Sequence, residues 1–319
     1  MTRTSRSSRR CALVLCAAAL MACGGGDDST PVNDTAVAVV APPDSMPVTP
    51  APISTWESDL GEALVIAGAA PDEAVIVLPD TIGLRANAGA PVLDALSGRE
   101  LVLYSRGRRI GAARVGAVAG AAEVGASCVQ WPTTRLSLDA AAGSAPGWTI
   151  ALDASRASLL PADSLEAFSA ADSSRLTAEI ARIASALPGD VDPDFRGLPF
   201  VVRTIHRIEL PSGSRALVAE VVRQVNQEAN PKREQLLLIA EGDSTRRSAL
   251  DAAAWWHRTS GMEEALETLS FVAAISIGSS HTPAIVLARE SSRGTAFTLL
   301  ERTGVRQWSE RWTSAIGGC

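Results

Sequence analysis

Apolar and polar residues alternate along much of the chain beyond residue 55, in short runs separated by glycine, proline, serine or aspartate. Alternation with a period of two is typical of a strand that buries one of its faces. A glycine-containing link at 105–109 further indicates a hairpin between two of these runs. Up to residue 155 the pattern therefore predicts an antiparallel sheet or small barrel, with strands at 74–78, 100–104, 109–118, 127–138 and 148–152.

Helical signals appear after Leu160. Asp163, with Glu166 three residues later, predicts a capping box at the start of one helix. A second helix is predicted to end at Pro188-Gly189, because the apolar residues before it recur at helical spacing: Leu176, Ile180, Ile183 and Leu187. We expect this apolar stripe to pack on the rest of the protein.

Alternation returns in the last third of the chain. Residues 200–210 and 215–225 predict two strands that are joined by the turn sequence Pro-Ser-Gly-Ser. Three more strands with glycine-containing turns are predicted within 282–312, where Trp308 and Trp312 fall on one face.

Residues 245–277 fit either a helix that ends at Gly261 or a set of strands. The alternation in the second half of this segment favours strands. Together these elements predict an α+β fold that is mainly antiparallel β. Two β-rich parts, 55–155 and 191–319, are expected to be joined by a helical connector at 156–190.

The N-terminus carries the marks of an export signal. Four arginines precede the apolar block Ala12–Ala22, and no acidic residue occurs before Asp27. A basic start, a short apolar run and small residues before a cleavage point are typical of secretory signals. The block is about half the roughly 20 residues that a membrane-spanning helix needs, so we do not expect a permanent span.

The block ends in Leu20-Met21-Ala22-Cys23, which resembles the lipobox of bacterial lipoproteins. The resemblance implies that residues 1–22 are a signal peptide and that Cys23 is acylated as the new first residue, giving stable attachment to a membrane. It also implies the outer membrane where the host has two, because position 24 is glycine rather than the aspartate associated with retention at the inner membrane. An ordinary secretory signal with an unrelated cysteine is the alternative.

Residues 23–54 are rich in proline, glycine, serine and threonine and offer little apolar surface for a core. We expect them to form a disordered, semi-extended tether.

The whole chain has a formal charge of −6, with 29 Lys and Arg against 35 Asp and Glu. Without the four arginines of residues 1–22, 25 basic residues remain against 35 acidic ones, and the charge is −10. This charge disfavours nucleic acid as a partner. The expected partners are the membrane, through the lipid anchor, and an envelope protein or a small ligand.

Two cysteines follow the tether, Cys128 and the C-terminal Cys319. In an oxidising envelope such a pair predicts a disulfide. Two unrelated thiols, one buried and one on a frayed tail, are the alternative.

An acidic loop offers the strongest candidate metal site. Asp190, Asp192 and Asp194 alternate in "GDVDPDFRG", and carboxylates at this spacing can converge on Ca²⁺. The loop is not an EF-hand, because Phe195 and Val201 occupy the positions of its glycine and its bidentate glutamate. The alternative is an acidic loop that closes a helix through local hydrogen bonds. No other cofactor is indicated.

The sequence carries no catalytic signature. Ser279 and Ser280 precede His281, and Cys128 is a further candidate nucleophile, but none lies in a hydrolase elbow motif. The remaining histidines, His206 and His257, have no metal-type spacing. The chain is therefore predicted to be a lipid-anchored cell-envelope protein with a binding or structural role. A hydrolase whose site is assembled from distant strands is the alternative.

Overall fold

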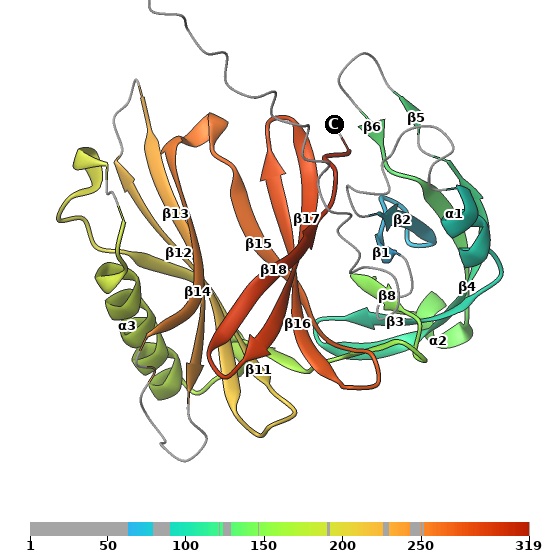
Figure 1. The fold of residues 1–319 in the computed structure, drawn as a ribbon, viewed down its shortest axis with the longest axis horizontal. Coiled ribbons are helices and arrows are strands. Elements are labelled where there is room, and N and C mark those ends of the chain that lie inside the picture. Colours follow the sequence, from blue (N-terminus) through green and yellow to red (C-terminus); the bar gives the residue numbers. More distant parts are fainter. Residues whose placement is uncertain are drawn as a thin grey trace, which may run out of the picture. The chain divides into compact units, whose positions relative to one another are not determined.

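The computed structural model describes residues 63–78, 90–120, 122–123, 129–145, 147–189, 192–225, 230–242, 250 and 252–318. Most of these residues lie in antiparallel strands, which form a closed six-stranded barrel, two five-stranded sheets and a two-stranded ribbon (Figure 1). The mainly antiparallel β character predicted from the alternation is therefore confirmed. In the described part of the chain, no helix has the length and apolar character needed to cross a bilayer.

The barrel contains the first strands of the chain. Around the barrel they follow one another in the order β1 (Leu64–Ala67), β2 (Glu73–Val77), β7 (Thr133–Leu138), β4 (Arg108–Ala119), β3 (Glu100–Ser105) and β8 (Ile150–Leu152). The predicted hairpin joins β3 to β4, and its two central residues, Arg106 and Gly107, both have positive φ, of 45° and 75°. Gly107 also lies against the backbone of Ala162, where a Cβ would be 3.0 Å from the carbonyl oxygen. Strand β1 and two short helices, α1 (Ala90–Leu96) and α2 (Ala140–Gly143), were not predicted.

The first five-stranded sheet follows the order β10 (Ala162–Ser164), β11 (Val201–Glu209), β12 (Arg215–Val225), β13 (Lys232–Gly242) and β14 (Ala253–Met262). The second follows the order β18 (Gln307–Thr313), β17 (Gly294–Gly304), β16 (Thr282–Ser291), β15 (Thr268–Ile277) and β9 (Ala157–Leu159). The strands predicted at 200–210, 215–225 and within 282–312 are confirmed. Within the ambiguous segment 245–277, strands β14 and β15 favour the strand interpretation for 253–262 and 268–277, and residues 245–249 and 251 lie outside the described residues. The ribbon pairs β5 (Ala122–Glu123) with β6 (Val129–Gln130).

Three apolar clusters hold these layers together. Residues of both sheets, such as Ile239 and Ile285, meet in one cluster between the sheets. The other face of the first sheet packs on helix α3 (Ala170–Ala186), and the other face of the second sheet packs on barrel residues. Central strands are consequently buried on both faces, and β13 runs through the core from Glu234 to Glu241.

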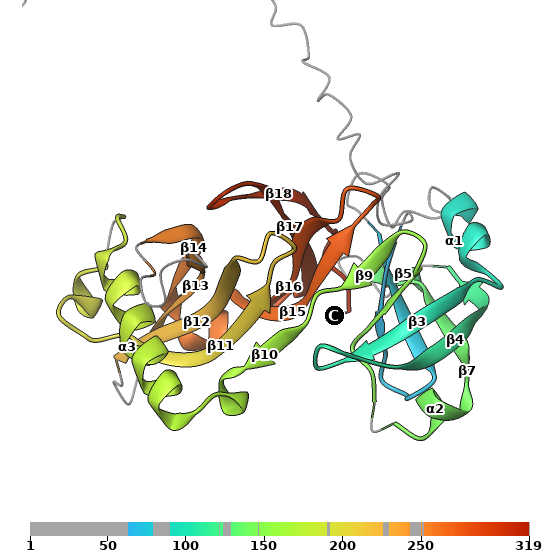
Figure 2. The ribbon, with the colours of Figure 1, turned by 90° about the horizontal axis from the view of Figure 1, so that it is seen from below.

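The segment between the barrel and β11 differs from the predicted helical connector. It begins with β9 and β10, which pair with β15 and β11 in different sheets (Figure 2). The prediction of a capping box is wrong, because Asp163 lies in β10 and Glu166 lies in the short 3₁₀ helix η1 (Leu165–Ala167). Ser169 caps the only long helix of this segment, α3, by accepting a hydrogen bond from the Asp172 amide.

The apolar stripe of α3 is confirmed, since Leu176, Ile180 and Ile183 are all buried. The prediction that Trp308 and Trp312 share one face of the sheet is wrong. Trp308 packs between the two sheets, whereas Trp312 packs in the cluster that contains the barrel. The pairing of β17 with β18 shifts register between Leu299 and Leu300, and a shift of one residue turns the following side chains to the other face.

Candidate functional site

One end of the first sheet is covered by residues 192–200, and an arginine fixes this loop. Arg223 of β12 donates from Nη1 to the carbonyl oxygens of Phe195, at 2.9 Å, and Leu198, at 3.5 Å. Its guanidinium carbon lies 4.6 Å from the centre of the Phe200 ring and 5.6 Å from that of Phe195. Phe195 ends the 3₁₀ helix η2 (Pro193–Phe195) and is fully buried. The loop is therefore held by hydrogen bonds and by cation–π contact with one side chain.

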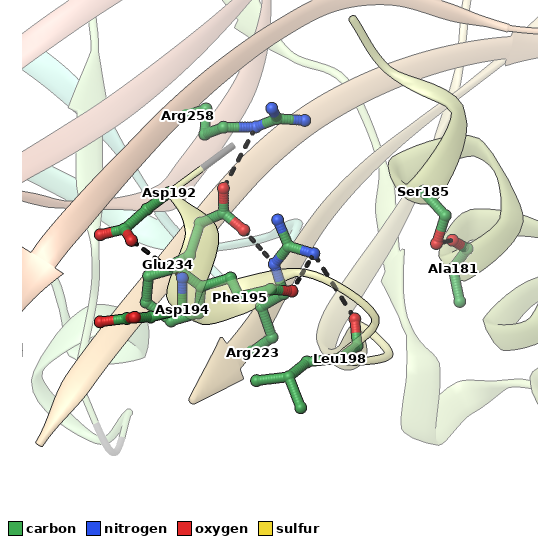
Figure 3. Close-up of polar contacts among 9 residues, drawn as sticks. All are labelled: Ala181, Ser185, Asp192, Asp194, Phe195, Leu198, Arg223, Glu234 and Arg258. Carbon is green, nitrogen blue, oxygen red and sulfur yellow. Dashed lines mark hydrogen bonds and ion pairs between the residues drawn. The ribbon is translucent and has the colours of Figure 1, made fainter. Parts of the chain in front are cut away.

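A buried carboxylate lies beside Arg223. Glu234 of β13 is directly opposite Arg223 in the sheet and is 1% exposed. Arg223 donates from Nε to Glu234 Oε2, and Arg258 of β14 places its Nε 3.5 Å from Glu234 Oε1 (Figure 3). The acidic side chain is thus enclosed by two guanidinium groups, as a buried charge requires.

Arg258 is incompletely hydrogen-bonded. Its Nε and Nη1 atoms are buried and make no hydrogen bond in the part of the chain that the structure describes, although Nε lies at ion-pair distance from Glu234. Nη1 lies 3.2 Å from the position that a Cβ on Gly189 would take, and the guanidinium carbon lies 5.9 Å from the centre of the Trp256 ring. Unused guanidinium donors are suited to oxygen acceptors such as a carboxylate or a hydroxyl.

Arg258 and Trp256 belong to the last strand of their sheet. No strand of the described residues is paired with the outer edge of β14. Trp256 is 37% exposed and Met262, at the end of the same strand, is 49% exposed. An edge to which no described strand is paired, together with exposed apolar side chains, is the best candidate for a binding surface.

Several residues singled out in the sequence lie outside the described residues: Cys23, Cys128, Cys319 and Asp190. The acylation of Cys23 and the Cys128–Cys319 disulfide therefore stay predictions. The calcium site also stays a prediction, because one of its three carboxylates is among these residues.

The other two carboxylates of that loop have local partners. Asp192 accepts a hydrogen bond from the Asp194 amide at 3.0 Å. The Lys232 ammonium group lies 2.6 Å from Asp194 Oδ2 and 3.8 Å from Asp192 Oδ2. The hydrogen bond to Asp194 raises the pKa of Lys232 above its ordinary value. Nowhere in the described ranges do three His, Cys, Asp or Glu side chains group closely enough to hold a metal ion.

The histidines of β11 and β14 are packed against aromatic rings. The ring centre of His206 is 4.3 Å from that of Phe271, and His257 stacks on Trp255 at 6.3 Å. Burial lowers the pKa of His206, against the opposing charge of Glu166, and burial also lowers the pKa of His257. Both imidazoles are therefore held in the neutral form more strongly than in an unfolded chain.

The structure places His281 beside Ser276, which the sequence interpretation did not single out. The Ser280 hydroxyl lies 2.8 Å from the Thr282 hydroxyl, and His281 Nδ1 lies 3.4 Å from the Ser276 hydroxyl. His281 itself has a positive φ of 52° in the turn between β15 and β16. Activation of a serine nucleophile by histidine normally involves a third group that orients the imidazole, and the described contacts of His281 name Ser276 alone as a side-chain partner.

The sequence interpretation missed Arg223, Glu234 and Arg258. A signal was present in "KREQLLLIAEG", where two glutamates flank the apolar run Leu236–Ala240. Acidic residues that border a strand buried on both faces require compensating charges nearby. The identity of those charges depends on strand order, which the sequence does not specify.

Comparison of the chain with models of protein families, with curated proteins and with solved structures gives no match. A function for this protein therefore has to come from its own residues and geometry.

Proposed function

We propose that this protein is a lipid-anchored component of the cell envelope, attached through Cys23, whose β-rich body binds a partner there. The observation that carries the proposal is the sequence Leu20-Met21-Ala22-Cys23 at the end of a basic and then apolar N-terminus. Acylation at this cysteine supplies the two hydrophobic chains that stable anchoring needs. The proline-rich segment after it supplies reach between the membrane and the body.

The edge strand β14 supports a binding role. Among the described residues no strand pairs with its outer edge, and the side chains of Trp256 and Met262 are exposed there. Surfaces of this kind are used by proteins that associate with other chains. The charge of the mature chain, −10, further directs the proposal toward a protein or small ligand and away from nucleic acid.

Metabolic labelling tests the anchor. Cells that express the protein are fed an alkyne-bearing palmitate, and the label on the purified protein is measured in the parent and in Cys23→Ala. We expect the parent to carry the label and to sediment with membranes, and the variant to lose the label. Cys16→Ala is the matched control, because Cys16 lies in the signal peptide and should not affect labelling. Label that persists in Cys23→Ala would contradict the proposal.

The choice of membrane is tested at the next residue. In a host with two membranes, Gly24→Asp should move the labelled protein from the outer to the inner membrane fraction. Gly25→Asp provides a control for the added charge. A parent protein that is already found in the inner membrane would remove the assignment to the outer membrane and leave the lipid anchor intact.

A further inference from the structure

Three of the four strands that end the two sheets are protected against pairing with another chain. Strands β9 and β10 are only three residues long. Strand β18 is seven residues long, contains Glu310 and Arg311, and shifts register twice in its pairing with β17. Short length, charge and irregular pairing all hinder the addition of a strand.

Strand β14 is less protected in the part of the chain that the structure describes. It has ten residues with no lysine or proline, its one charged side chain, Arg258, is ion-paired with Glu234 of β13, and it pairs with β13 without irregularity from Trp255 to Met262. Strand β18 approaches β14 without pairing with it. Trp256 and Met262 are six residues apart on this regular stretch, so both side chains lie on the same face of the sheet. The edge therefore presents a straight ladder of backbone groups with two apolar side chains beside it.

We infer that β14 pairs in antiparallel orientation with β14 of a second copy of this chain, about a two-fold axis at Thr259. Directly opposite residues in an antiparallel pair share a face, so a β14 residue opposes one that is an even number of positions away. With the axis at Thr259, each Trp256 lies opposite Met262 of the partner subunit. The two exposed apolar side chains of the strand thereby cover one another twice.

The neighbouring registers are less favourable. An axis at Arg258 sets the two Arg258 side chains opposite each other, and like charges opposite one another are destabilising. An axis at His257 leaves Met262 uncovered, and an axis at Ser260 sets Trp256 beyond the end of β14 of the partner subunit, where it is uncovered too. The axis at Thr259 instead places the small polar side chain of Ser260 of the partner subunit opposite Arg258, so no like charges face each other. The avoidance of charge repulsion and the apolar complementarity thus select the same register.

The association does not depend on the lipid anchor, and it covers the outer edge of β14, the longer of the two edge strands described for the first sheet. A two-fold contact of this kind is isologous, so it produces a closed dimer and no fibre. It also joins the first sheets of the two copies into one continuous sheet.

Disulfide trapping tests the register. Thr259→Cys is introduced into the full chain, the detergent-solubilised protein is oxidised, and dimers are measured on a non-reducing gel. Only a residue on the axis has its own counterpart directly opposite, within the reach of a disulfide. We expect rapid dimer formation by Thr259→Cys and none above the parent by Ser260→Cys, whose counterpart is displaced along the strand. The parent, run alongside, accounts for the native cysteines.

A charge exchange tests the contact between Trp256 and Met262 of the partner subunit. Trp256→Glu in the Thr259→Cys protein should lower the rate of dimer trapping at least about tenfold, because a carboxylate then faces an apolar side chain. Adding Met262→Lys should restore trapping, since each Glu then opposes a Lys across the axis. Val305→Glu is the matched control, because Val305 is 77% exposed and lies outside β14.

Each outcome decides the inference. Trapping at 259 alone, lost in Trp256→Glu and restored in the double variant, supports it. Equal trapping at 259 and 260, no trapping at either, or loss caused equally by Val305→Glu overturns it. Disulfide adducts of Thr259→Cys with another protein, in place of dimers, also overturn it and show instead that an extended segment of that protein occupies the edge.

Discussion

Two buried glutamates on the same strand, Glu234 and Glu241, have very different surroundings. They lie near the two ends of β13 and are 1% and 2% exposed. Glu241 accepts two hydrogen bonds from the Arg302 guanidinium, at 2.9 and 3.0 Å, one from the Arg306 amide at 3.1 Å and one from Trp308 Nε1 at 2.6 Å. Glu234 has one hydrogen-bonding arginine and a second arginine, Arg258, that lies at ion-pair distance but makes no hydrogen bond to it.

The difference separates a buried carboxylate that accepts four hydrogen bonds from one whose second arginine makes no hydrogen bond to it. Glu241 faces the interior between the sheets and joins β13 to β17 and β18 through hydrogen bonds from Arg302 and Trp308. A complete network of this kind fixes one arrangement of the two sheets, and removing one member exposes the others to the cost of burial without a partner. Glu234 fixes a loop through Arg223, whereas Arg258, on the last described strand of the sheet, keeps buried donors that make no hydrogen bond to the described residues. The predictions below test this contrast.

Removing the Glu241 carboxylate should have the largest effect on stability. Glu241→Ala leaves the Arg302 guanidinium and the Trp308 indole N–H buried without their acceptor, so the free energy of unfolding should fall by about 3–5 kcal/mol. Urea unfolding measures this change. Glu264→Ala, at an exposed glutamate, is the matched control and should stay within about 0.5 kcal/mol of the parent.

Replacing the arginine partner of each glutamate separates the two sites more sharply. Arg302→Met should lower the free energy of unfolding by about 2–4 kcal/mol, because Glu241 stays buried with fewer donors. Arg258→Met should cost less than about 1 kcal/mol, because Glu234 keeps its hydrogen bond from Arg223 and two unsatisfied buried donors are removed. Equal losses in the two variants, measured in the same denaturant series, would show that Arg258 is as fully satisfied as Arg302.

A third polar side chain of β13, Gln235, provides an uncharged reference. Its amide donates to the Leu269 carbonyl oxygen at 3.2 Å and accepts from the Leu269 amide at 3.0 Å, so one side chain satisfies a backbone residue of the other sheet. Gln235→Leu should destabilise the protein by about 1–3 kcal/mol, since it leaves buried backbone groups without partners. Hydrogen exchange of the Leu269 amide should accelerate in the variant; an unchanged exchange rate would mean that water or another group replaces the glutamine.

The surroundings of β13 also explain what the sequence could and could not predict. Strands with one exposed face alternate, and most of them were found from that pattern. The strand β13 carries apolar residues at every position from Leu236 to Ala240 because both of its faces are buried, so it has no alternation to detect. The prediction that Trp308 and Trp312 share a face failed because the strand contains a register shift, and a register shift is not visible in the sequence pattern.

The candidate site was less predictable than the fold. Glu234 meets Arg223 because β12 and β13 are neighbours in a given register, and it meets Arg258 because β14 follows on the other side. These contacts join residues that are far apart in sequence, and no local pattern specifies them. By contrast, the signal and lipobox at Leu20–Cys23 are read by the export machinery as a linear sequence, so that prediction needed no fold.

The pH dependence of stability provides the finest test of the contrast. Burial of Glu241 opposes ionisation, but the hydrogen bonds from Arg302, the Arg306 amide and Trp308 outweigh it and lower the pKa of Glu241 below its ordinary value of 4.5. The folded protein therefore binds fewer protons at this site than the unfolded chain does, so its contribution to stability is complete above about pH 4.5 and is lost as the pH falls through the folded pKa. The expected loss of stability is about 1.4 kcal/mol for each unit by which the pKa is lowered.

Urea unfolding between pH 7 and pH 3 measures this loss. The free energy of unfolding should fall less steeply with decreasing pH in Glu241→Gln than in the parent, whereas Glu264→Gln should show the same pH dependence as the parent. An acid-side slope in Glu241→Gln equal to that of the parent would mean that the hydrogen bonds to Glu241 do not distinguish its ionised form from its protonated form.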